Sequence, residues 1–454
     1  MKVSIGVENF GKIKKTEITL GRLILFVGEN NSGKTFMMQL LYGVTSAIIN
    51  NSQLLMQKSE EKGVDYYVDA HALSEWEKNV NEYLEREKEQ IVKDIFYRDI
   101  PIGKLYVRIV DVDLSYFVGI KRNKLLREID SNSYFATDKD EEYIYEVEIN
   151  IKKNDNEENN KRRIRFGGKI DKKLVDRYIN RTIVGNILGM YQSESALFFP
   201  ASRTGMLLLY KYFFAEKDNK MYMMETDDER QVAKNQLGLS APVYNFLQFL
   251  LRFTPDSFIS HRDQEILDYI EENLIDGRLE LSKEESYYIP KDSEQMIPLY
   301  LSSSLINELA PIVKMLSSVY PYDDIYYDEI ETCLHPLKQK AMARLMMRLV
   351  NSGRRLVIST HSDSMAINLN NLLTFTLGNW GEEIKSKKMK ELGLEEADIL
   401  KTKDVHVYQF TNSDDGTSSA SELEFRTVNN LGYDFELFNQ NLQKLSDDTI
   451  KIME

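Results

Sequence analysis

The sequence has a single cysteine, Cys333, among its 454 residues. A disulfide framework within the chain is therefore excluded, and so is a zinc site built from thiolates of this chain alone. No stretch approaches about 18 uninterrupted apolar residues, and the N-terminus lacks the apolar run of a signal peptide. We therefore expect a soluble, cytoplasmic protein that does not contact a membrane.

The chain has no excess of positive charge, because 72 acidic residues outnumber 58 Lys and Arg and give a formal net charge of −14. A protein that grips nucleic acid over its whole surface needs a basic footprint, so this class is disfavoured. Two basic clusters remain candidate DNA contacts: Lys161, Arg162, Arg163 and Arg165, and Lys385, Lys387, Lys388 and Lys390. Their acidic neighbours favour the simpler interpretation of solvated surface charge. The stretch KKNDNEENNKRR, which contains part of the first cluster, is predicted to be a loop.

Apolar residues make up 42% of the chain, which is enough for a large core. The apolar strand LILFV is predicted at 23–27, and an apolar helix over 34–49 follows a glycine-rich turn. After residue 301 the α/β pattern returns, with strands predicted at DIYYDE and RLVIST on either side of a helix that Pro336 opens. We therefore predict an α/β fold in two halves, 1–50 and 291–454. The segment 51–290 is predicted to be an insertion with β and mainly helical parts.

The segment GENNSGKT at 28–35 fits the pattern G-x-x-x-x-G-K-[ST] between a strand and a helix. Glycines let backbone N–H groups close around phosphates, and the helix N-terminus adds a favourable field for their charge. Lys34 is expected to reach the β- and γ-phosphates of ATP, and the Thr35 hydroxyl to bind Mg²⁺. The residues predicted to bind the nucleotide here are Gly28, Asn30, Asn31, Ser32, Gly33, Lys34 and Thr35.

Two adjacent acids, Asp328 and Glu329, end the predicted strand IYYDE. Phosphate-loop ATPases need a carboxylate for the metal and a group that orients the attacking water. Asp328 is therefore predicted to hold Mg²⁺, directly or through water, and Glu329 to polarise the water. For Glu331, a supporting role and simple surface charge are equally consistent with the sequence.

His361 and a run of three serines complete the candidate site. His361 follows a strand in the sequence STHS, where it could contact the γ-phosphate or the attacking water, so we predict that it is catalytic. Ser302, Ser303 and Ser304 directly precede a predicted helix. They either cap its free N–H groups or contact a γ-phosphate across a subunit interface, and the sequence leaves both interpretations open.

Taken in order, NFGKIKKTEI, FVGENNSGKT, LSSS, DEIETCLHP and STHS resemble the ABC-type ATPase heads of the OLD-like and RecF/SMC-related families. The resemblance covers 1–50, 195–210 and 295–365. It implies an ABC-type P-loop ATPase head with an antiparallel β-subdomain, and it makes Arg203 in FFPASRTG a candidate phosphate or Mg²⁺-network residue. Two departures are clear: Ile330 replaces the proline of the familiar DEPE string, and the familiar LSGGQ is present only as LSSSL.

The resemblance also carries expectations about partners. Such heads pair head to tail as homo-oligomers and trap two ATP molecules between a phosphate loop and the partner's serines. OLD-family nucleases append a Toprim domain, but Asp414 and Asp415 lack the spacing of its acids, so a separate nuclease effector is expected. Stand-alone heads of this kind resemble ATPase subunits of bacterial anti-phage systems. The alternatives are a RecF-like repair ATPase that clamps DNA, a transporter's nucleotide-binding subunit, and a nuclease that acts alone.

Overall fold

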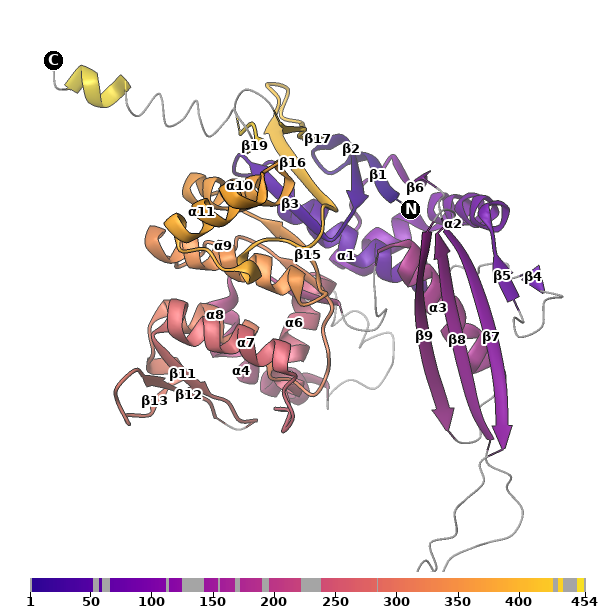
Figure 1. Cartoon of the computed structure of the whole chain (residues 1–454), viewed down its shortest axis with the longest axis horizontal. Coiled ribbons are helices and arrows are strands. Elements are labelled where there is room, and N and C mark those ends of the chain that lie inside the picture. The colour runs from indigo at the N-terminus through magenta and orange to yellow at the C-terminus, as the bar shows by residue number, and fades with distance from the viewer. Residues whose placement is uncertain are drawn as a thin grey trace, which may run out of the picture.

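The computed structural model contains a nine-stranded mixed sheet at its centre (Figure 1). It describes residues 2–51, 57–58, 66–111, 114–124, 143–153, 156–167, 172–189, 196–221, 238–283, 285–427, 432–435 and 447–452. In spatial order the strands are β10 (Ala196–Phe199), β14 (Asp324–Tyr327), β15 (Arg355–Ser359), β3 (Leu23–Gly28), β16 (Val405–Asn412), β17 (Ser418–Glu422), β2 (Ile13–Leu20), β1 (Lys2–Phe10) and β6 (Lys104–Asp111).

The first five strands of this order run parallel, whereas β2, β1 and β6 pair antiparallel. The carboxyl ends of β14, β15 and β3 therefore meet at one edge of the sheet. Ligands of open α/β sheets bind outside that edge. The predicted α/β class with an antiparallel β part is confirmed.

Helices cover both faces of the sheet, because central strands such as β3 are apolar on both faces. Successive side chains of a strand point to opposite faces. Leu25 and Val27 join one buried cluster, whereas Ile24 and Phe26 join the other. Because β3 is apolar on both faces, it is buried between two helical layers.

The first layer contains α1 (Lys34–Asn51), α2 (Ala70–Phe96) and α3 (Lys172–Ile187). The second contains α7 (His261–Ile270), α8 (Ser304–Leu316), α9 (Pro336–Asn351) and α10 (Asp363–Leu377), with α4 (Arg203–Met221) and α6 (Ala241–Arg252) toward the β10 edge. Within the described ranges, no helix combines the length and apolar character that a membrane crossing needs.

The segment predicted as an insertion, 51–290, supplies both edge strands of the central sheet, β6 and β10. It also forms a separate five-stranded sheet of β4 (Gln57–Lys58), β5 (Tyr66–Val68), β7 (Leu114–Lys124), β8 (Tyr143–Lys153) and β9 (Asn156–Gly167). The long strands β7, β8 and β9 project away from the head (Figure 1). A small sheet of β11 (Gly277–Glu280), β12 (Tyr287–Pro290) and β13 (Ile297–Pro298) precedes α8, and β18 (Phe425–Arg426) pairs with β19 (Gly432–Tyr433).

The prediction of a loop at KKNDNEENNKRR is wrong, because most of this stretch belongs to strand β9. The backbone register sets Arg163 opposite Glu148 and Arg165 opposite Glu146. Opposite charges directly across two strands favour pairing, so a strongly charged sequence can still form a strand. The same register places an acid of β8 across from two members of the first basic cluster.

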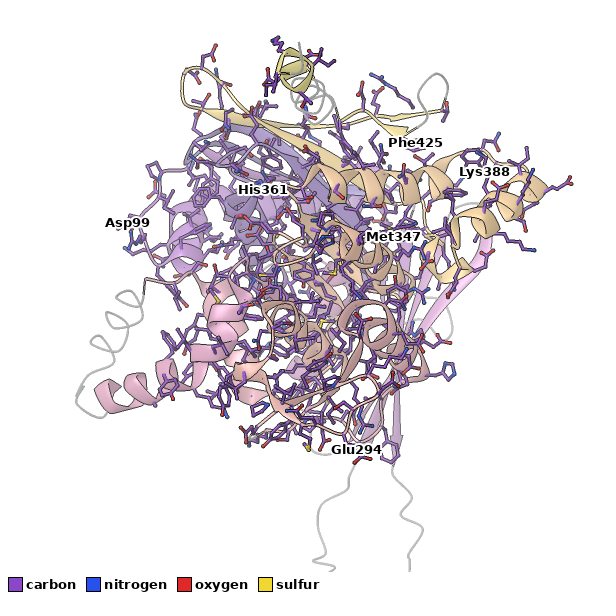
Figure 2. All side chains as sticks on the ribbon, turned by 90° about the vertical axis from the view of Figure 1, so that its left-hand side faces the viewer. Asp99, Glu294, Met347, His361, Lys388 and Phe425 are labelled. Carbon is purple, nitrogen blue, oxygen red and sulfur yellow. The ribbon has the colours of Figure 1, made fainter. Side chains whose placement is uncertain are left out.

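The second basic cluster lies on α11 (Glu382–Leu392), which carries acids among its lysines. Figure 2 shows Lys388 at the outer edge of the molecule, well away from His361. Lys388 lies over the ring of Trp380 at 5.0 Å, and Lys387 is 4.0 Å from Glu391. These contacts agree with solvated surface charge.

Candidate active site

The loop between β3 and α1 has a backbone that requires glycine at two positions. Gly28 has φ +129°, and a Cβ at this position would lie 2.1 Å from the carbonyl oxygen of Phe410 on β16. Gly33 has φ +95°. Helix α1 begins at Lys34 and has no acidic residue in its first turn. The N-terminal N–H groups of α1 therefore face no carboxylate from their own turn. Such free N–H groups at a helix N-terminus can bind a phosphate.

Lys34 is only 3% exposed, and its side chain folds back over the loop. Its Nζ donates to the carbonyl oxygens of Gly28 and Glu29 at 2.9 and 2.6 Å, and to Ser32 Oγ at 3.3 Å. Burial lowers the pKa of the Lys34 ammonium to about 8, although the negative charge of Asp328 acts in the opposite direction. The loop therefore holds one cation where a polyphosphate is predicted to bind.

A hairpin from the C-terminal part of the chain holds this loop in place. Asn412, at the end of β16, donates from its Nδ2 to Glu29 Oε2 at 2.7 Å and to the Asn30 carbonyl oxygen at 3.2 Å. Lys12 Nζ donates to Asn412 Oδ1 at 2.8 Å and also to the Asn31 carbonyl oxygen. Neither Lys12 nor Asn412 lies in a sequence pattern that would mark it as a site residue.

The phosphate loop and the acidic strand end meet directly. Thr35 Oγ1 donates to Asp328 Oδ2 at 2.8 Å, across 293 sequence positions, and Ser359 Oγ donates to Asp328 Oδ1 at 2.5 Å. Burial raises the pKa of Asp328, whereas the hydrogen bonds from Ser359 and Thr35 lower it.

This donor set fits Mg²⁺. The ion prefers oxygen ligands and is held in such sites by one or two carboxylates together with substrate phosphates and water. Thr35 and Asp328 offer a hydroxyl and a carboxylate oxygen side by side. No group of three or more His, Cys, Asp or Glu side chains suited to a metal occurs in the described part of the chain.

Glu329 has a left-handed backbone, with φ +49°, at the turn after β14. Its N–H donates to Ser359 Oγ at 2.9 Å, and its half-buried carboxylate lies 3.2 Å from His361 Nε2. The hydrogen bond with His361 holds the pKa of Glu329 below its usual value. A carboxylate that is ionised and partly accessible to solvent has the properties that a water-orienting base needs.

Glu331 supports His361, which decides between the two interpretations left open by the sequence. Glu331 Oε1 accepts from the backbone N–H groups of His361 and Ser362 at 2.5 and 3.1 Å, at the N-terminus of α10. Among the described residues, Glu331 Oε2 and His361 Nδ1 are buried without a hydrogen-bond partner. Each of these two atoms could therefore form one more hydrogen bond close to Asp328 and Glu329.

Arg203, a candidate phosphate or Mg²⁺-network residue by resemblance, lies behind the two acids. Its guanidinium is fully buried and lies 4.3 Å from the centre of the Tyr327 ring. It donates to the carbonyl oxygens of Pro200 and Asp328 at 2.9 and 2.5 Å, and to that of Glu329 at 3.0 Å. These contacts make Arg203 a support for the backbone that carries both acids.

Within the serine segment, which we define as Ser302–Ser304, Ser303 caps α8. Ser303 Oγ accepts from the Ile306 N–H at 3.4 Å, and Ser302 Oγ donates to the Leu299 carbonyl oxygen at 2.7 Å. Ser303 and Ser304 are exposed. In the part of the chain that the structure describes, no hydrogen bond joins these serines to the phosphate loop. The capping interpretation is confirmed for Ser303, and the contact with a partner's γ-phosphate stays a prediction.

Ser359 was not singled out from the sequence, yet it contacts both acids. Ser359→Ala is expected to raise the Mg²⁺ concentration needed for half-maximal ATP hydrolysis by roughly tenfold, because ligands that lose an orienting hydrogen bond bind metals less tightly. Loss of the hydrogen bond also raises the pKa of Asp328 further, so the defect should be larger at pH 6 than at pH 8. Mg²⁺ titrations of the ATPase rate at both pH values measure this effect. Ser364→Ala, in the first turn of α10, is the control, and an unchanged Mg²⁺ requirement in Ser359→Ala would contradict the assignment.

Several solved structures resemble this chain distantly. No curated protein matches the sequence significantly. Similar solved structures include the Smc head domain of Pyrococcus furiosus bound to the C-terminal domain of ScpA (11% identity, 100% of both chains, TM-score 0.35). A second is an SmcHead bound to the C-winged helix domain of ScpA, with 13% identity over 94% of this chain and 97% of that chain and a TM-score of 0.35. A third is the SMC head domain from Thermotoga maritima, with 11% identity over 93% of this chain and 98% of that chain and a TM-score of 0.34.

The family comparison spans most of the chain. Residues 1–366 match the model of the AAA_15 family, described as an AAA ATPase domain. The match runs through the segment 51–290, which supplies both edges of the central sheet. The chain therefore belongs to the AAA_15 family of ATPase domains.

Proposed function

We propose that this chain binds Mg²⁺ and ATP, hydrolyses ATP, and uses that cycle in the cytoplasm to control a separate effector of a bacterial anti-phage complex. The observation that carries the enzymatic part is the Thr35–Asp328 hydrogen bond. It joins the phosphate loop to the acidic strand end, so both halves of the candidate site lie within one hydrogen bond of each other.

Each site residue has a distinct task in hydrolysis. The Lys34 ammonium and the α1 N-terminus hold the phosphates, and Thr35 and Asp328 hold Mg²⁺, which when bound neutralises phosphate charge. Glu329 orients and polarises the attacking water. His361, which is 3.2 Å from Glu329, keeps that carboxylate ionised and aimed. Positioning and charge neutralisation supply most of the catalysis in this class of reaction.

The exposed serine segment supports pairing of two heads. Tyr300 and Leu301, directly before it, are 63% and 66% exposed, although they are large apolar side chains. A second copy that binds head to tail would cover them and place its own ATP against Ser303 and Ser304. For ATP to close such a dimer, it must bind the closed state much more tightly than the open state.

Control of an effector rests on the resemblance of DEIETCLHP and the other motifs to OLD-like heads. Asp414 and Asp415 form a tight turn in which Asp415 Oδ1 accepts from Thr417 N–H and Oγ1 at 2.9 and 2.5 Å. Asp415 therefore has a structural role in this turn. A Toprim-type nuclease is the effector that we propose. The PARIS system, with its ATPase AriA and nuclease AriB, is the arrangement to which this chain would correspond.

DNA clamping is the second candidate, and one observation weakens it. In the backbone register, Arg163 and Arg165 of β9 are paired with Glu148 and Glu146 of β8, and the chain as a whole carries a formal charge of −14. A DNA clamp should show DNA-stimulated ATPase activity and binding that weakens steeply with salt.

Co-expression of the chain with its neighbouring genes tests the proposal. The tagged chain should co-purify with a metal-dependent nuclease, and Lys34→Ala should change the amount retained, since the complex depends on ATP. Lys387→Ala, on the exposed face of α11, is the matched lysine control. Isolation of this chain alone, together with DNA-stimulated ATPase activity, would favour the DNA clamp and overturn effector control.

A further inference from the structure

Helix α8 connects the serine segment to a buried ion pair. Its 13 residues begin at Ser304, and Glu308 lies one turn into the helix with 2% of its surface exposed. Glu308 Oε1 contacts Arg203 Nη2, and Glu308 Oε2 accepts from Thr204 Oγ1 at 2.7 Å. The first turn of α8 is therefore fixed to the start of α4 by two buried contacts.

The same guanidinium reaches the acids of the nucleotide site. Arg203 donates to the carbonyl oxygens of Asp328 and Glu329 at 2.5 and 3.0 Å. A continuous path of contacts thus runs from Ser304 along one helical turn to Glu308, then through Arg203 to the backbone of Glu329. One helical turn and one side-chain pair therefore separate the exposed Ser304 from the backbone of Glu329, the predicted base.

Stability alone is a weak reason for this pair. Removing two charges from water costs several kcal/mol per ion, and apolar replacements of buried ion pairs are often neutral or stabilising. The Arg203–Glu308 pair is buried on both sides, with 0% and 2% of the side chains exposed. Its placement between two functional segments suggests a role in their relative position.

We infer that the Arg203–Glu308 pair is a positioning device that couples the serine segment to Glu329. Engagement of the serines by a partner's ATP would shift the first turn of α8, and Arg203 would carry that shift to the two carbonyl groups it holds. Hydrolysis at a chain's own site would then depend on the nucleotide of its partner. This inference rests on the head-to-tail pairing proposed above.

The geometry of Glu329 makes such a link effective. Its left-handed backbone, with φ +49°, is held by Ser359 Oγ at its N–H and by Arg203 at its carbonyl oxygen. A small rotation of these peptide groups changes the direction in which the carboxylate points. Because non-glycine residues rarely adopt this conformation, the surrounding contacts, including those of Arg203, determine it.

Glu308→Gln tests the coupling, because it keeps the side-chain volume but removes the charge that pairs with Arg203. The ATP dissociation constant should stay within about twofold of the parental value, since Glu308 contacts no part of the phosphate loop. We expect kcat to fall by at least about fivefold, within the usual range of coupling between sites. The Hill coefficient for ATP should fall from near 2 toward 1, because two paired sites set its upper limit.

Asp324→Asn is the matched control. Asp324 and Arg355 form another fully buried pair, 2.8 Å apart, at the opposite end of β14 from the acids. Loss of the Asp324–Arg355 ion pair should lower the melting temperature about as much as Glu308→Gln does, while kcat and the Hill coefficient stay at parental values. If Glu308→Gln is too unstable to purify, Arg203→Lys keeps the charge but cannot hold both carbonyl groups, and it should show the same loss of cooperativity.

The outcomes separate the two ideas. A parental protein that hydrolyses ATP without cooperativity and stays monomeric with ATP would overturn head pairing and this inference together. A cooperative parental protein whose Glu308→Gln and Arg203→Lys variants remain equally cooperative would overturn the coupling and leave the proposed function intact. Equal defects in Asp324→Asn and Glu308→Gln would show a purely structural role.

Discussion

Lys34→Ala is expected to weaken ATP binding by roughly 10- to 100-fold, because hydrogen bonds to charged groups contribute about 1.5–3 kcal/mol. The substitution removes the buried cation that lies over the loop and donates to Gly28 and Glu29. Titration with a fluorescent ATP analogue or calorimetry measures the loss. A variant that binds ATP with parental affinity would contradict the location of the phosphates.

The same residue predicts a pH dependence of binding. Burial lowers the pKa of Lys34 to about 8, so its positive charge is present at pH 7 and is lost as the pH rises through 8. Phosphates favour the charged form, so binding should take up protons near pH 8 and weaken between pH 7 and 9. Lys34→Ala should lack this change. Lys314→Met is the control for folding, because Lys314 on α8 is also buried and its pKa is also lowered to about 8, but it lies over the ring of Phe253 instead of the phosphate loop.

Glu329→Gln is expected to lower kcat by about 100- to 10,000-fold, which is the usual contribution of a general base. The amide keeps the volume of the side chain and can still bond to His361, but it cannot accept a proton from water. ATP binding should persist, so an ATP-bound dimer should accumulate. Single-turnover hydrolysis and light scattering in the presence of ATP measure the two effects.

A carboxylate away from the site provides the comparison for Glu329. Glu395 pairs with Arg348 at 2.9 Å on the surface, so Glu395→Gln should hydrolyse ATP at the parental rate. A parental rate in Glu329→Gln would show that another group activates the water. Slow hydrolysis without dimer accumulation would separate catalysis from head pairing.

The parts of the site that could be predicted from the sequence are those marked by a short continuous motif or by a position directly after a strand. The phosphate loop is one uninterrupted pattern, and Asp328, Glu329 and His361 each follow a buried strand. Strands β14 and β15 pair directly with parallel register, which brings these residues to one edge. Thr35 and Asp328 therefore meet as expected. The division at residues 50 and 290 stays a prediction, although β6 and β10 tie the middle segment into the head.

The parts that sequence reasoning missed depend on contacts between distant residues. Ser359 and Asn412 are ordinary residues at a strand end and in a hairpin, and only the fold shows that they touch the acids or the phosphate loop. The position of β16 beside β3 was also missed, because strand patterns do not give strand order. Strand β9 was missed because its many charged and polar residues are typical of a loop.

The middle segment borders the central sheet on both sides, with β10 at one edge and β6 at the other. A shortened chain without 51–290 would leave β14 and β1 with unpaired backbone groups, and open strand edges of that kind promote aggregation. The projecting strands β7–β9 follow β6 and precede β10 in the chain (Figure 1). A force applied to that projection would therefore reach the central sheet at both of its edge strands. Strand β10 pairs directly with β14, the strand that precedes Asp328 and Glu329.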